Sequence, residues 1–208
     1  MIHLICSENK NLYADLLPQM YQQRSSVFVD RMKWDLVCEN GQEKDQFDTE
    51  DTIYLVALDD ETGKILSSIR LNPTNKPHLM SDIFNDLCEG GVPRGPTIFE
   101  GSRYCYNPEL KSRADRLIAM RYMICGVMEC AVLNGWEQIT FVINMPLLSH
   151  CLRAGWNIYP LGIPEYRNKL AVGAFAIDVT HQGLESVRAN LGLFESQLIV
   201  ETSISKVA

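Results

Sequence analysis

The stretch TIYLVALDDETGKILSSIRL, residues 52–71, holds two apolar runs on either side of a polar turn. Residues 52–59 and 64–71 each have the length and composition of a β-strand, and Gly63 lies at the tip of the turn. The pattern therefore predicts an antiparallel hairpin. Arg70 lies in the second strand, and an arginine is costly to bury unless it is paired. We expect Arg70 either at a cleft or in a buried ion pair.

The segments outside the hairpin alternate between strand and helix patterns. Residues 1–6 predict a strand at the edge of the fold, and residues 11–32 predict a helix that Pro18 divides into two. Further along we expect a short helix capped by Ser81, a loop at 89–96, a strand at 97–106, a helix at 113–135 with an apolar face (Leu117, Met120, Ile124, Met128 and Leu133), a strand at 138–144, a helix at 145–154 ended by Gly155, and a strand at 170–179.

This order predicts an α/β fold. We expect a single-domain α/β/α sandwich over residues 1–180, with a mixed, mostly antiparallel sheet, and a helical tail over 181–208. Hydrophobic residues make up 46% of the chain, which suffices for a full core. The formal net charge of −7 argues against wholesale binding to nucleic acid.

The cysteines and histidines are scattered. The seven cysteines form no CxxC pair and several lie in apolar runs, so we expect reduced thiols in a cytoplasmic protein. The four histidines have no metal-ligand spacing, so we expect no metal site and no cofactor. There is no signal-peptide pattern and no apolar run of membrane-spanning length.

Residues 24–48, RSSVFVDRMKWDLVCENGQEKDQFD, mix aromatic residues with charges. Arg24 and Phe28 share a helix face, Trp34 follows near the end of that helix, and Asp45 and Asp48 flank Phe47. One interpretation is a solvated helix and an acidic loop. The other is a lid, in which carboxylates meet a cation, the arginine meets an anion and the rings meet an aromatic base. These residues alone leave both open.

The strand TIFEGSRYCY, residues 97–106, carries Glu100 and Arg103, which a regular strand would turn to opposite sides. Gly101 lies between them, and a glycine inside a strand often marks a bulge. We predict a bulge or splay there that brings both charged groups to one cleft. The alternative is a pair of surface charges on an edge strand.

Taken together, these segments are familiar. The chain resembles the acyl-homoserine lactone synthase (autoinducer synthase) family of bacterial quorum sensing through VFVDRMKW, DQFD, RLNPT, FEGSR and RAGW. The resemblance covers about residues 1–179, and eight markers occur in order: Arg24, Phe28, Trp34, Asp45, Asp48, Arg70, Glu100 and Arg103.

The resemblance implies a fold similar to GCN5-related N-acetyltransferases. It implies two substrates, S-adenosylmethionine and an acyl thioester of acyl carrier protein or coenzyme A, and the products N-acyl-homoserine lactone, methylthioadenosine and free carrier. The acetyltransferases' glycine-rich pyrophosphate loop is not visible before residue 113, which argues against simple acetyl-CoA chemistry and leaves acyl-CoA open.

The resemblance also implies roles for the markers. Glu100 accepts the proton of the attacking amine, directly or through a water, and backbone N–H groups near Arg103 stabilise the oxyanion. Arg103 and Arg70 hold the substrate carboxylate or pair with acids that shape the pocket. The expected S-adenosylmethionine-binding residues are Arg24, Phe28, Trp34, Asp45, Asp48 and Arg103.

Acyl specificity depends on one strand. An ungapped alignment from RAGW places Phe141 where 3-oxo-acyl enzymes of the family tend to carry threonine, and Thr140 points to the other face unless the register differs by one. We therefore favour an unsubstituted, branched or aryl acyl chain. The candidate pocket residues are Ile139, Phe141 and Ile143 on one face of that strand. Further candidates, which are equally compatible with plain core packing, are Ser102, Met123, Leu148 and Leu152.

The carrier is open as well. A basic group that could receive an acidic acyl carrier protein consists of Lys111, Arg113, Arg116, Arg121 and Arg153. Ser149 and His150 stand where the family would suggest further docking lysines, which keeps acyl-CoA in play. Two other functions are alternatives to the synthase: a non-catalytic acyl or nucleotide sensor on the same scaffold, and an N-acyltransferase for another amine.

Overall fold

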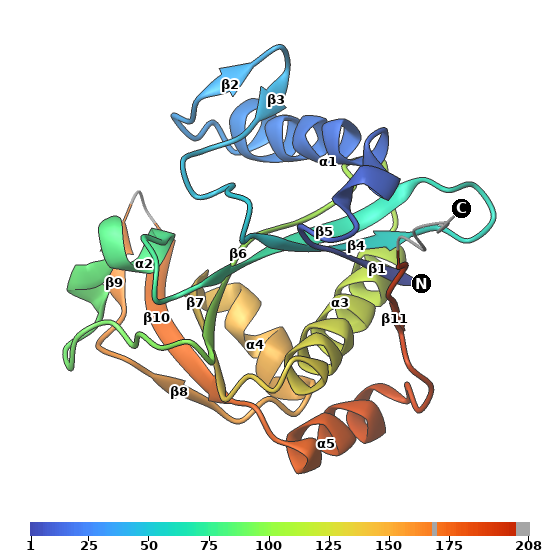
Figure 1. The fold of residues 1–208 in the computed structure, drawn as a ribbon. Coiled ribbons are helices and arrows are strands. Elements are labelled where there is room, and N and C mark those ends of the chain that lie inside the picture. The colour runs from blue at the N-terminus through green and yellow to red at the C-terminus, as the bar shows by residue number, and fades with distance from the viewer. Residues whose placement is uncertain (168–169, 203–208) are drawn as a thin grey trace. The chain divides into compact units, whose positions relative to one another are not determined.

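The computed structural model describes residues 1–167 and 170–202. The chain divides into two compact units. Unit 1 consists of Met1–Arg70, Arg103–Met123 and the segment from Leu198, and unit 2 consists of Leu71–Ser102 and Ile124–Gln197. Strands β5 (Ile65–Pro73) and β6 (Ile98–Tyr106) and helix α3 (Arg113–Leu133) contribute residues to both units. Figure 1 labels the elements.

In unit 1 the predicted hairpin is present as β4 (Ile53–Leu58) and β5, with Gly63 in the left-handed region at φ 68°. Strand β1 (Ile2–Ile5) pairs antiparallel with β4 and parallel with β11 (Leu198–Ile199). The expected edge position of β1 was therefore wrong, because β11 lies outside it. A two-residue strand so far along the chain has no local pattern to reveal it.

The N-terminal helical region consists of a 3₁₀ turn η1 (Lys10–Tyr13), α1 (Leu16–Arg24) and a π-helical segment η2 (Ser25–Arg31). The predicted break at Pro18 was wrong. Pro18 is the third residue of α1, where a backbone N–H has no partner within the helix, so the proline removes no hydrogen bond there. The chain leaves α1 directly for η2, and the interruption lies earlier, between η1 and α1.

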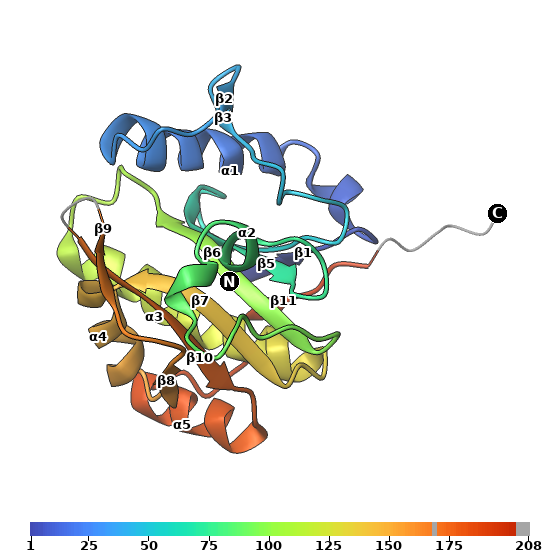
Figure 2. The same cartoon turned by 90° about the vertical axis from the view of Figure 1, so that its left-hand side faces the viewer.

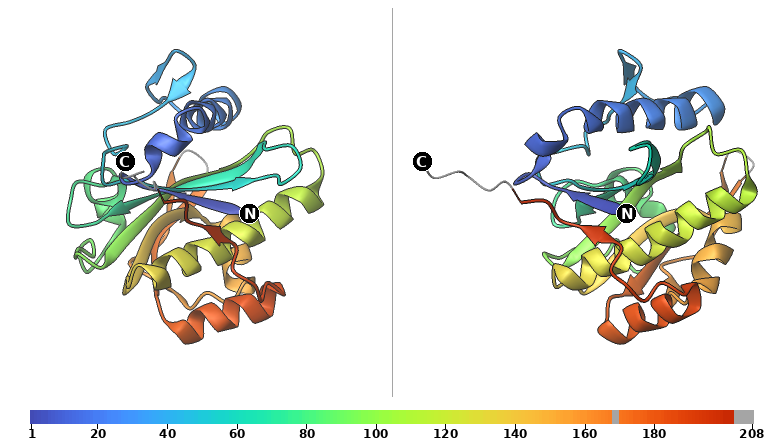
Figure 3. Two further views of the ribbon diagram at one scale, coloured as in Figure 1. Left: turned by 45° about the vertical axis from the view of Figure 1, so that its right-hand side comes forward. Right: turned by 90° about the vertical axis from the view of Figure 1, so that its right-hand side faces the viewer.

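Helix α1 lies over one face of β1, β4 and β5, as Figures 1 and 3 show. The apolar cluster between them contains Ile5, Tyr13, Met20, Tyr54, Val56 and Ile65. A small hairpin, β2 (Cys38–Glu39) and β3 (Gln42–Glu43), follows η2. Asn40 and Gly41 form its turn with φ of 52° and 76°, the positive values that two-residue hairpin turns favour. This hairpin carries the chain back to unit 1's charged residues.

In unit 2, β7 (Gln138–Asn144) is a central strand, as predicted. It pairs parallel with β6 and antiparallel with β10 (Leu170–Asp178), and β10 also pairs with β8 (Ile158–Pro160) and β9 (Glu165–Arg167). Figure 2 shows β7, β10 and β8 in this order. Helix α4 (Met145–Arg153) packs against β7 and β10.

The register of β7 fixes which side chains share a face. Phe141 lies opposite Gly101 and Phe175, whereas Thr140 lies opposite Glu100 and Ala176. Residues directly opposite each other on neighbouring strands point to the same face, and alternate residues point to opposite faces. Ile139, Phe141 and Ile143 therefore share one face of β7, as predicted, and Thr140 lies on the face away from Phe141.

Several helix ends differ from the expectation or refine it. The helix α2 (Leu79–Asp82) begins two residues before Ser81, so Ser81 is not its N-cap residue as predicted. Its Oγ instead accepts a hydrogen bond from the backbone N of His78, the N-cap residue, as the N3 half of a capping box. A 3₁₀ turn η3 (Asn85–Leu87) follows. Helix α4 ends before Gly155, which has φ 92°, as predicted. Helix α5 (His181–Leu191) buries Val187 and is followed by β11, a strand that the prediction does not include.

Helix α3 has a narrower apolar stripe than predicted. Met120, Ile124 and Met128 are buried, but Leu117 and Leu133 are exposed. Leu133 comes five positions after Met128, about 140° around an α-helix, so it turns away from the core. Leu117 lies in the first turns of α3, where most side chains are exposed. Within the described residues, no helix combines the length and apolarity that crossing a membrane requires.

Candidate active site

Six charged side chains of unit 1 form a continuous cluster that we call the arginine–carboxylate network. Three arginines and three carboxylates take part, so the formal charges cancel. Its members come from α1, β3, the loop after β3, β5 and β6: Arg24, Glu43, Asp45, Asp48, Arg70 and Arg103. All six side chains are at most 14% exposed. Five of them are predicted site residues that the fold brings together.

Arg24 anchors the network from the last turn of α1. Its Nη1 and Nη2 donate to the two carboxylate oxygens of Asp48 over 2.7 and 2.9 Å, and its Nε donates to Oε2 of Glu43 over 2.6 Å. Burial lowers the pKa of Arg24, but the bonds and charges of Asp48 and Glu43 outweigh it and raise that pKa. Bidentate pairs of this kind fix orientation as well as charge.

Asp48 is the most heavily bonded acid of the network. Besides Arg24 it accepts from Tyr54 Oη over 2.8 Å and from the backbone N of Asp45 over 2.9 Å, and Arg70 Nη1 lies 3.1 Å away. Burial raises the pKa of the Asp48 carboxyl. The hydrogen bonds and charge of Arg24, together with the charge of Arg70, lower that pKa by more than burial raises it, so it lies below the ordinary range. Asp48 is therefore a structural anion at neutral pH.

Arg103 occupies an unusual backbone conformation. Its φ is 55°, a left-handed value that costs a non-glycine residue of order 1–3 kcal/mol. Its Nε donates to Oε1 of Glu43 over 3.2 Å and its Nη2 to Oδ2 of Asp45 over 2.8 Å, which together hold that conformation. The predicted distortion at Gly101 was wrong in position, because Gly101 pairs in register with Phe141 and has no positive φ.

Arg70 resolves the choice made from the hairpin pattern. It is 0% exposed and donates from Nη1 to Oδ1 of Asp45, so the buried ion pair is the correct alternative. Its guanidinium carbon lies 5.8 Å from the ring centre of Phe47. Each carboxylate oxygen of Asp45 thus accepts from one arginine, Arg70 or Arg103.

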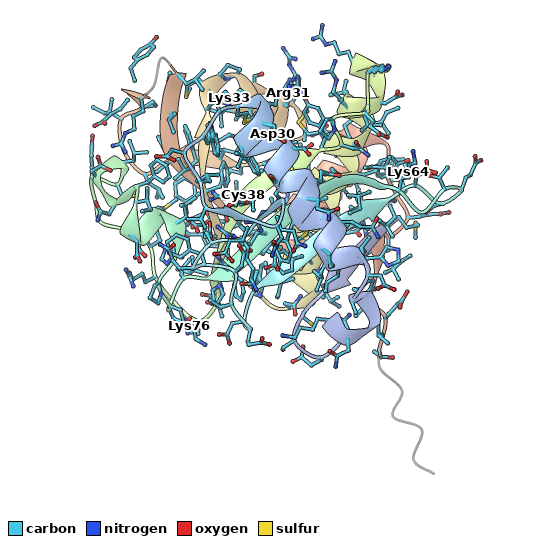
Figure 4. All side chains as sticks on the ribbon, turned by 90° about the horizontal axis from the view of Figure 1, so that it is seen from above. Asp30, Arg31, Lys33, Cys38, Lys64 and Lys76 are labelled. Atoms are coloured by element: carbon cyan, nitrogen blue, oxygen red, sulfur yellow. The ribbon has the colours of Figure 1, made fainter. Side chains whose placement is uncertain are left out.

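Two aromatic residues lie beside the network. The rings of Phe28 and Trp34 stack with centres 5.0 Å apart, and the Arg103 guanidinium carbon lies 5.6 Å from the centre of Phe28. Phe28 is buried, whereas Trp34 is 43% exposed. Figure 4 shows Asp30, Arg31 and Lys33 at the end of the η2 helix, just before Trp34. Phe28 is positioned by a π-helix, a form that often occurs at functional sites.

Glu43 is the network member that the sequence analysis missed. It bridges Arg24 and Arg103 and is 0% exposed. Its signal was weak: in GQEKDQFD it precedes Asp45 by two residues, so the two share a face if the chain is extended. Tyr54, the hydroxyl donor to Asp48, was hidden in an ordinary apolar strand.

Glu100 lies in unit 2, three residues before Arg103 on β6. It is 1% exposed, and its carboxylate accepts from the backbone N of Leu79 over 3.0 Å and from the backbone N of Met80. These two N–H groups fix the orientation of the carboxylate. On the neighbouring strand β7, Thr140 lies directly opposite Glu100. The arrangement suits a base whose oxygen atoms must stay in place.

The predicted acyl-pocket residues divide between two faces of unit 2. Ile139, Phe141 and Ile143 share one face, where the Phe141 ring lies 5.8 Å from Trp156 and 6.2 Å from Phe175. By strand alternation Ser102 shares the opposite face with Glu100. On α4, Leu148 is buried and Leu152 is 50% exposed. Met123 belongs to unit 1.

One member of the predicted basic group, Arg116, lies with Arg31 at a tyrosine. Arg31 and Arg116 both lie over the ring of Tyr106, at 5.8 and 5.6 Å, and Arg116 Nη1 lies 3.4 Å from its hydroxyl. The hydrogen bond from Arg116 and the nearby charges of both arginines lower the pKa of Tyr106 despite its partial burial. Among the described residues, neither arginine has a carboxylate partner.

The other predicted docking residues differ in position. Lys111 and Arg113 are exposed at the start of α3, and Arg121 is half-buried farther along it. Arg153 is exposed at the end of α4, in unit 2. Among the residues with described positions, no group of three or more His, Cys, Asp or Glu side chains is arranged to hold a metal ion.

Comparison with known proteins gives a consistent result. A family model described as autoinducer synthase matches residues 8–187. An isovaleryl-homoserine lactone synthase from Bradyrhizobium diazoefficiens is 32% identical over 195 residues, which cover 93% of this chain and 86% of the relative. An acyl-homoserine-lactone synthase from Agrobacterium fabrum is 31% identical and covers 73% of this chain and 74% of its own.

Solved structures agree. BjaI, a CoA-dependent acyl-homoserine lactone synthase solved with S-adenosylmethionine and isopentyl-CoA, has a TM-score of 0.88 and 31% identity, covering 97% of this chain and 93% of its own. MesI, also CoA-dependent, has a TM-score of 0.84 and 32% identity, covering 95% and 98%. An acyl-CoA N-acyltransferase from Pseudomonas aeruginosa, 15% identical, has a TM-score of 0.55 over 85% of this chain and 99% of its own. These matches confirm the predicted α/β fold, a mixed sheet with flanking helices similar to N-acyltransferases.

Proposed function

The chain belongs to the autoinducer synthase family, and from this premise we propose that it acylates S-adenosylmethionine from a short-chain acyl-CoA. It is an acyl-homoserine lactone synthase, an acyltransferase that makes a quorum-sensing signal. The observation that carries the proposal is the buried arginine–carboxylate network, which keeps the family's charged markers in contact. The proposal needs no cofactor besides the two substrates, and the free cysteines favour a cytoplasmic location.

In the first step the amine of S-adenosylmethionine, as a free base, attacks the thioester carbonyl. A C–N bond forms, the C–S bond breaks, and the carrier leaves as a thiol. The ammonium form must lose two protons in all, one to the leaving sulfur and one to solvent. Glu100 is the proposed acceptor, because it is a buried carboxylate that two backbone N–H groups hold in a fixed orientation.

The network and the aromatic pair would bind the nucleoside substrate. Arg103 and Arg70 supply positive charge for its carboxylate, and their own charges are balanced by Asp45. Trp34 supplies an exposed ring, backed by Phe28, on which the adenine or the sulfonium can pack. Arg24, Glu43 and Asp48 bond to one another and to Arg103, so their proposed role is to position the residues that contact the substrate.

In the second step the substrate carboxylate attacks the carbon bonded to the sulfonium. A C–O bond closes the lactone, the C–S bond breaks, and methylthioadenosine leaves with the electron pair of that bond. A sulfonium is already a good leaving group, so orientation contributes more here than acid catalysis. Arg70 and Arg103 are held rigidly enough by Asp45 to provide that orientation.

Arg31 and Arg116, the two arginines at Tyr106, favour acyl-CoA as the donor. Two guanidinium groups without carboxylate partners lie over one ring, beside a hydroxyl, which suits the phosphate groups of a carrier. BjaI and MesI, which match this chain with TM-scores of 0.88 and 0.84, are CoA-dependent. Acyl carrier protein, which brings a single phosphate and an acidic surface, is the competing donor.

The aromatic cluster supports a short or branched acyl group. The ring centre of Phe141 lies 5.8 Å from that of Trp156 and 6.2 Å from that of Phe175. Phe141 is on the strand face proposed for the acyl tail. Three rings leave less depth than aliphatic residues would, and Phe141 offers no hydroxyl to a 3-oxo group. An isovaleryl group, with four carbons in its main chain, is the first candidate, because the relative from Bradyrhizobium diazoefficiens is an isovaleryl-homoserine lactone synthase.

The test is an assay of the purified chain with S-adenosylmethionine and a panel of donors, with mass spectrometry of the lactone. We expect turnover with isovaleryl-CoA above octanoyl-CoA and 3-oxo-hexanoyl-CoA, and at least tenfold higher kcat/KM than with isovaleryl-acyl carrier protein. Arg116→Gln should raise the KM for acyl-CoA, while Arg94→Gln, at an exposed position after η3, serves as the control. Preference for the carrier protein would overturn the CoA proposal and leave the synthase in place.

A further inference from the structure

Thr140 presents a buried hydroxyl group at the centre of β7. Its side chain is 0% exposed, and its Oγ1 has no hydrogen-bond partner within the part of the chain that the structure describes. It lies directly opposite Glu100 on β6 and Ala176 on β10, so all three side chains share one face of the unit 2 strands. Neighbouring strands lie about 4.8 Å apart, so the side chains of Thr140 and Glu100 project side by side from β7 and β6.

This hydroxyl group weakens the folded state. A buried polar atom without a hydrogen bond has lost water and gained nothing in return, whereas valine would fill the same volume without that loss. The neighbours do not explain it, because Ala176 is apolar and the Glu100 carboxylate is taken up by the backbone N–H groups of Leu79 and Met80. A residue kept at a cost to stability points to a contact made during the reaction.

A second polar atom without a partner occurs nearby in the chain. His78, the residue before Leu79, is 0% exposed, and its Nδ1 lies 2.8 Å from the carbonyl oxygen of Lys76. That carbonyl only accepts, so Nδ1 carries the proton and Nε2 is left as an acceptor, again without a partner among the described residues. The residue next to Leu79 therefore supplies a second buried polar atom that can bind water.

We propose that Thr140 is a positioning residue whose hydroxyl holds the water through which Glu100 takes the proton of the attacking amine. The inference rests on the proposed role of Glu100. The amine gives a proton to the water as the water gives one to the carboxylate, so the water is regenerated. The protonated Glu100 then supplies the proton that the thiolate leaving group needs. The hydroxyl accepts or donates one hydrogen bond throughout and is not consumed.

Thr140 and the residues proposed to bind the acyl chain lie on opposite faces of β7, which distinguishes a role in proton transfer from a role in recognising the acyl chain. Phe141 and its aromatic neighbours lie on the other face of β7, where the acyl tail is proposed to bind. Thr140 should therefore affect the rate of acyl transfer equally for every acyl group. A hydroxyl that contacted the acyl chain would instead change the preference among donors.

The experiment compares Thr140→Val and Thr140→Ser with wild type, with Glu100→Gln and with Ser67→Ala. Ser67 is a matched control, since its Oγ is also buried without a described partner but lies in unit 1, outside the proposed machinery. We expect Thr140→Val to lower kcat at least tenfold and alter the solvent isotope effect. Both KM values should stay within twofold, and the thermal midpoint should be equal to or above wild type. Thr140→Ser should restore most of kcat, and Ser67→Ala should keep full activity.

Two results would overturn the role of Thr140 and leave the role of Glu100 in place. One is a kcat for Thr140→Val within twofold of wild type while Glu100→Gln is inactive. The other is a loss of activity in Thr140→Val that is confined to particular acyl groups. Full activity of Glu100→Gln would overturn the assigned base together with the inference. If Thr140→Val does not fold, Thr140→Ala and Thr140→Ser give the same comparison, because both keep the site small enough to pack.

Discussion

Arg24, in the last turn of α1, donates two parallel hydrogen bonds of 2.7 and 2.9 Å to Asp48, in the loop after β3. The sequence separates them by a π-helical segment and two short strands, and the bidentate geometry closes that loop onto unit 1. Both side chains are at most 1% exposed, so the pair is a structural clamp. Buried ion pairs contribute little net stability when intact but are costly to break on one side.

Glu43→Gln should be among the most damaging single substitutions. It removes one carboxylate from between Arg24 and Arg103 and leaves both guanidinium groups with less charge compensation. We expect a loss of about 3 kcal/mol in the free energy of unfolding and a fall in lactone formation of at least about 100-fold, a size typical of lost active-site positioning. Urea denaturation and a lactone assay measure the two effects. Glu39→Gln on the neighbouring, exposed strand is the control, and equal damage from both would contradict the network's role.

The acid limit of stability should depend on Asp48. Arg24 and Arg70 hold the pKa of its carboxyl below the ordinary value of about 3.9, so the ionised form stabilises the fold above that value. The stabilisation is lost as the pH falls below about 4 and the native protein must take up the proton. Asp48→Asn should be less stable at pH 7 and show a flatter stability curve below pH 4. The exposed Asp30→Asn should follow wild type; a wild-type curve for Asp48→Asn would be evidence against the clamp.

Trp34 should matter for substrate binding more than for folding. Its ring is 43% exposed and stacks on Phe28, so the side chain offers a face to a ligand. Trp34→Ala should raise the KM for S-adenosylmethionine about tenfold, in line with the loss of an aromatic contact of 0.5–1.5 kcal/mol. Trp34→Phe should stay within about twofold. Steady-state kinetics give the answer, with the exposed Val37→Ala as control, and an unchanged KM in Trp34→Ala would remove it from the site.

Phe141 should limit the length of the acyl chain. Phe141→Ala opens space between Phe175 and Trp156, so kcat/KM for octanoyl-CoA should rise relative to isovaleryl-CoA. The same change should cost about 3 kcal/mol of stability, because it empties a buried aromatic position. Leu133→Ala, at an exposed position of α3, should change neither. Destabilisation without any change in chain preference would identify Phe141 as plain core.

The parts of the fold with strong local patterns were predictable. The hairpin around Gly63, strand β7 and the C-terminal end of α4 at Gly155 follow from apolar spacing and glycine positions. Pro18 misled the helix prediction because its effect depends on its place within the helix, which only the true start at Leu16 reveals. Strand β11 was invisible because two residues form a strand only by pairing with β1.

The site was predictable to the extent that it follows family markers. The resemblance supplied Arg24, Asp48 and Arg103, and the structure adds how they pair. Glu43 and Thr140 could not be found in this way, because one becomes special by lying between two arginines and the other by facing Glu100 across a strand. Such roles depend on tertiary contacts, which spacing along a chain does not encode.

The most direct test of the central claim is a mass-spectrometric assay for N-acyl-homoserine lactone and methylthioadenosine. Purified wild type and Glu100→Gln, with matched thermal midpoints, would be incubated with S-adenosylmethionine and isovaleryl-CoA. We predict both products in equal amounts from wild type and a loss of at least about 100-fold in the variant, the range for general base catalysis. Methylthioadenosine without lactone, or an unaltered yield from Glu100→Gln, would contradict the proposed reaction.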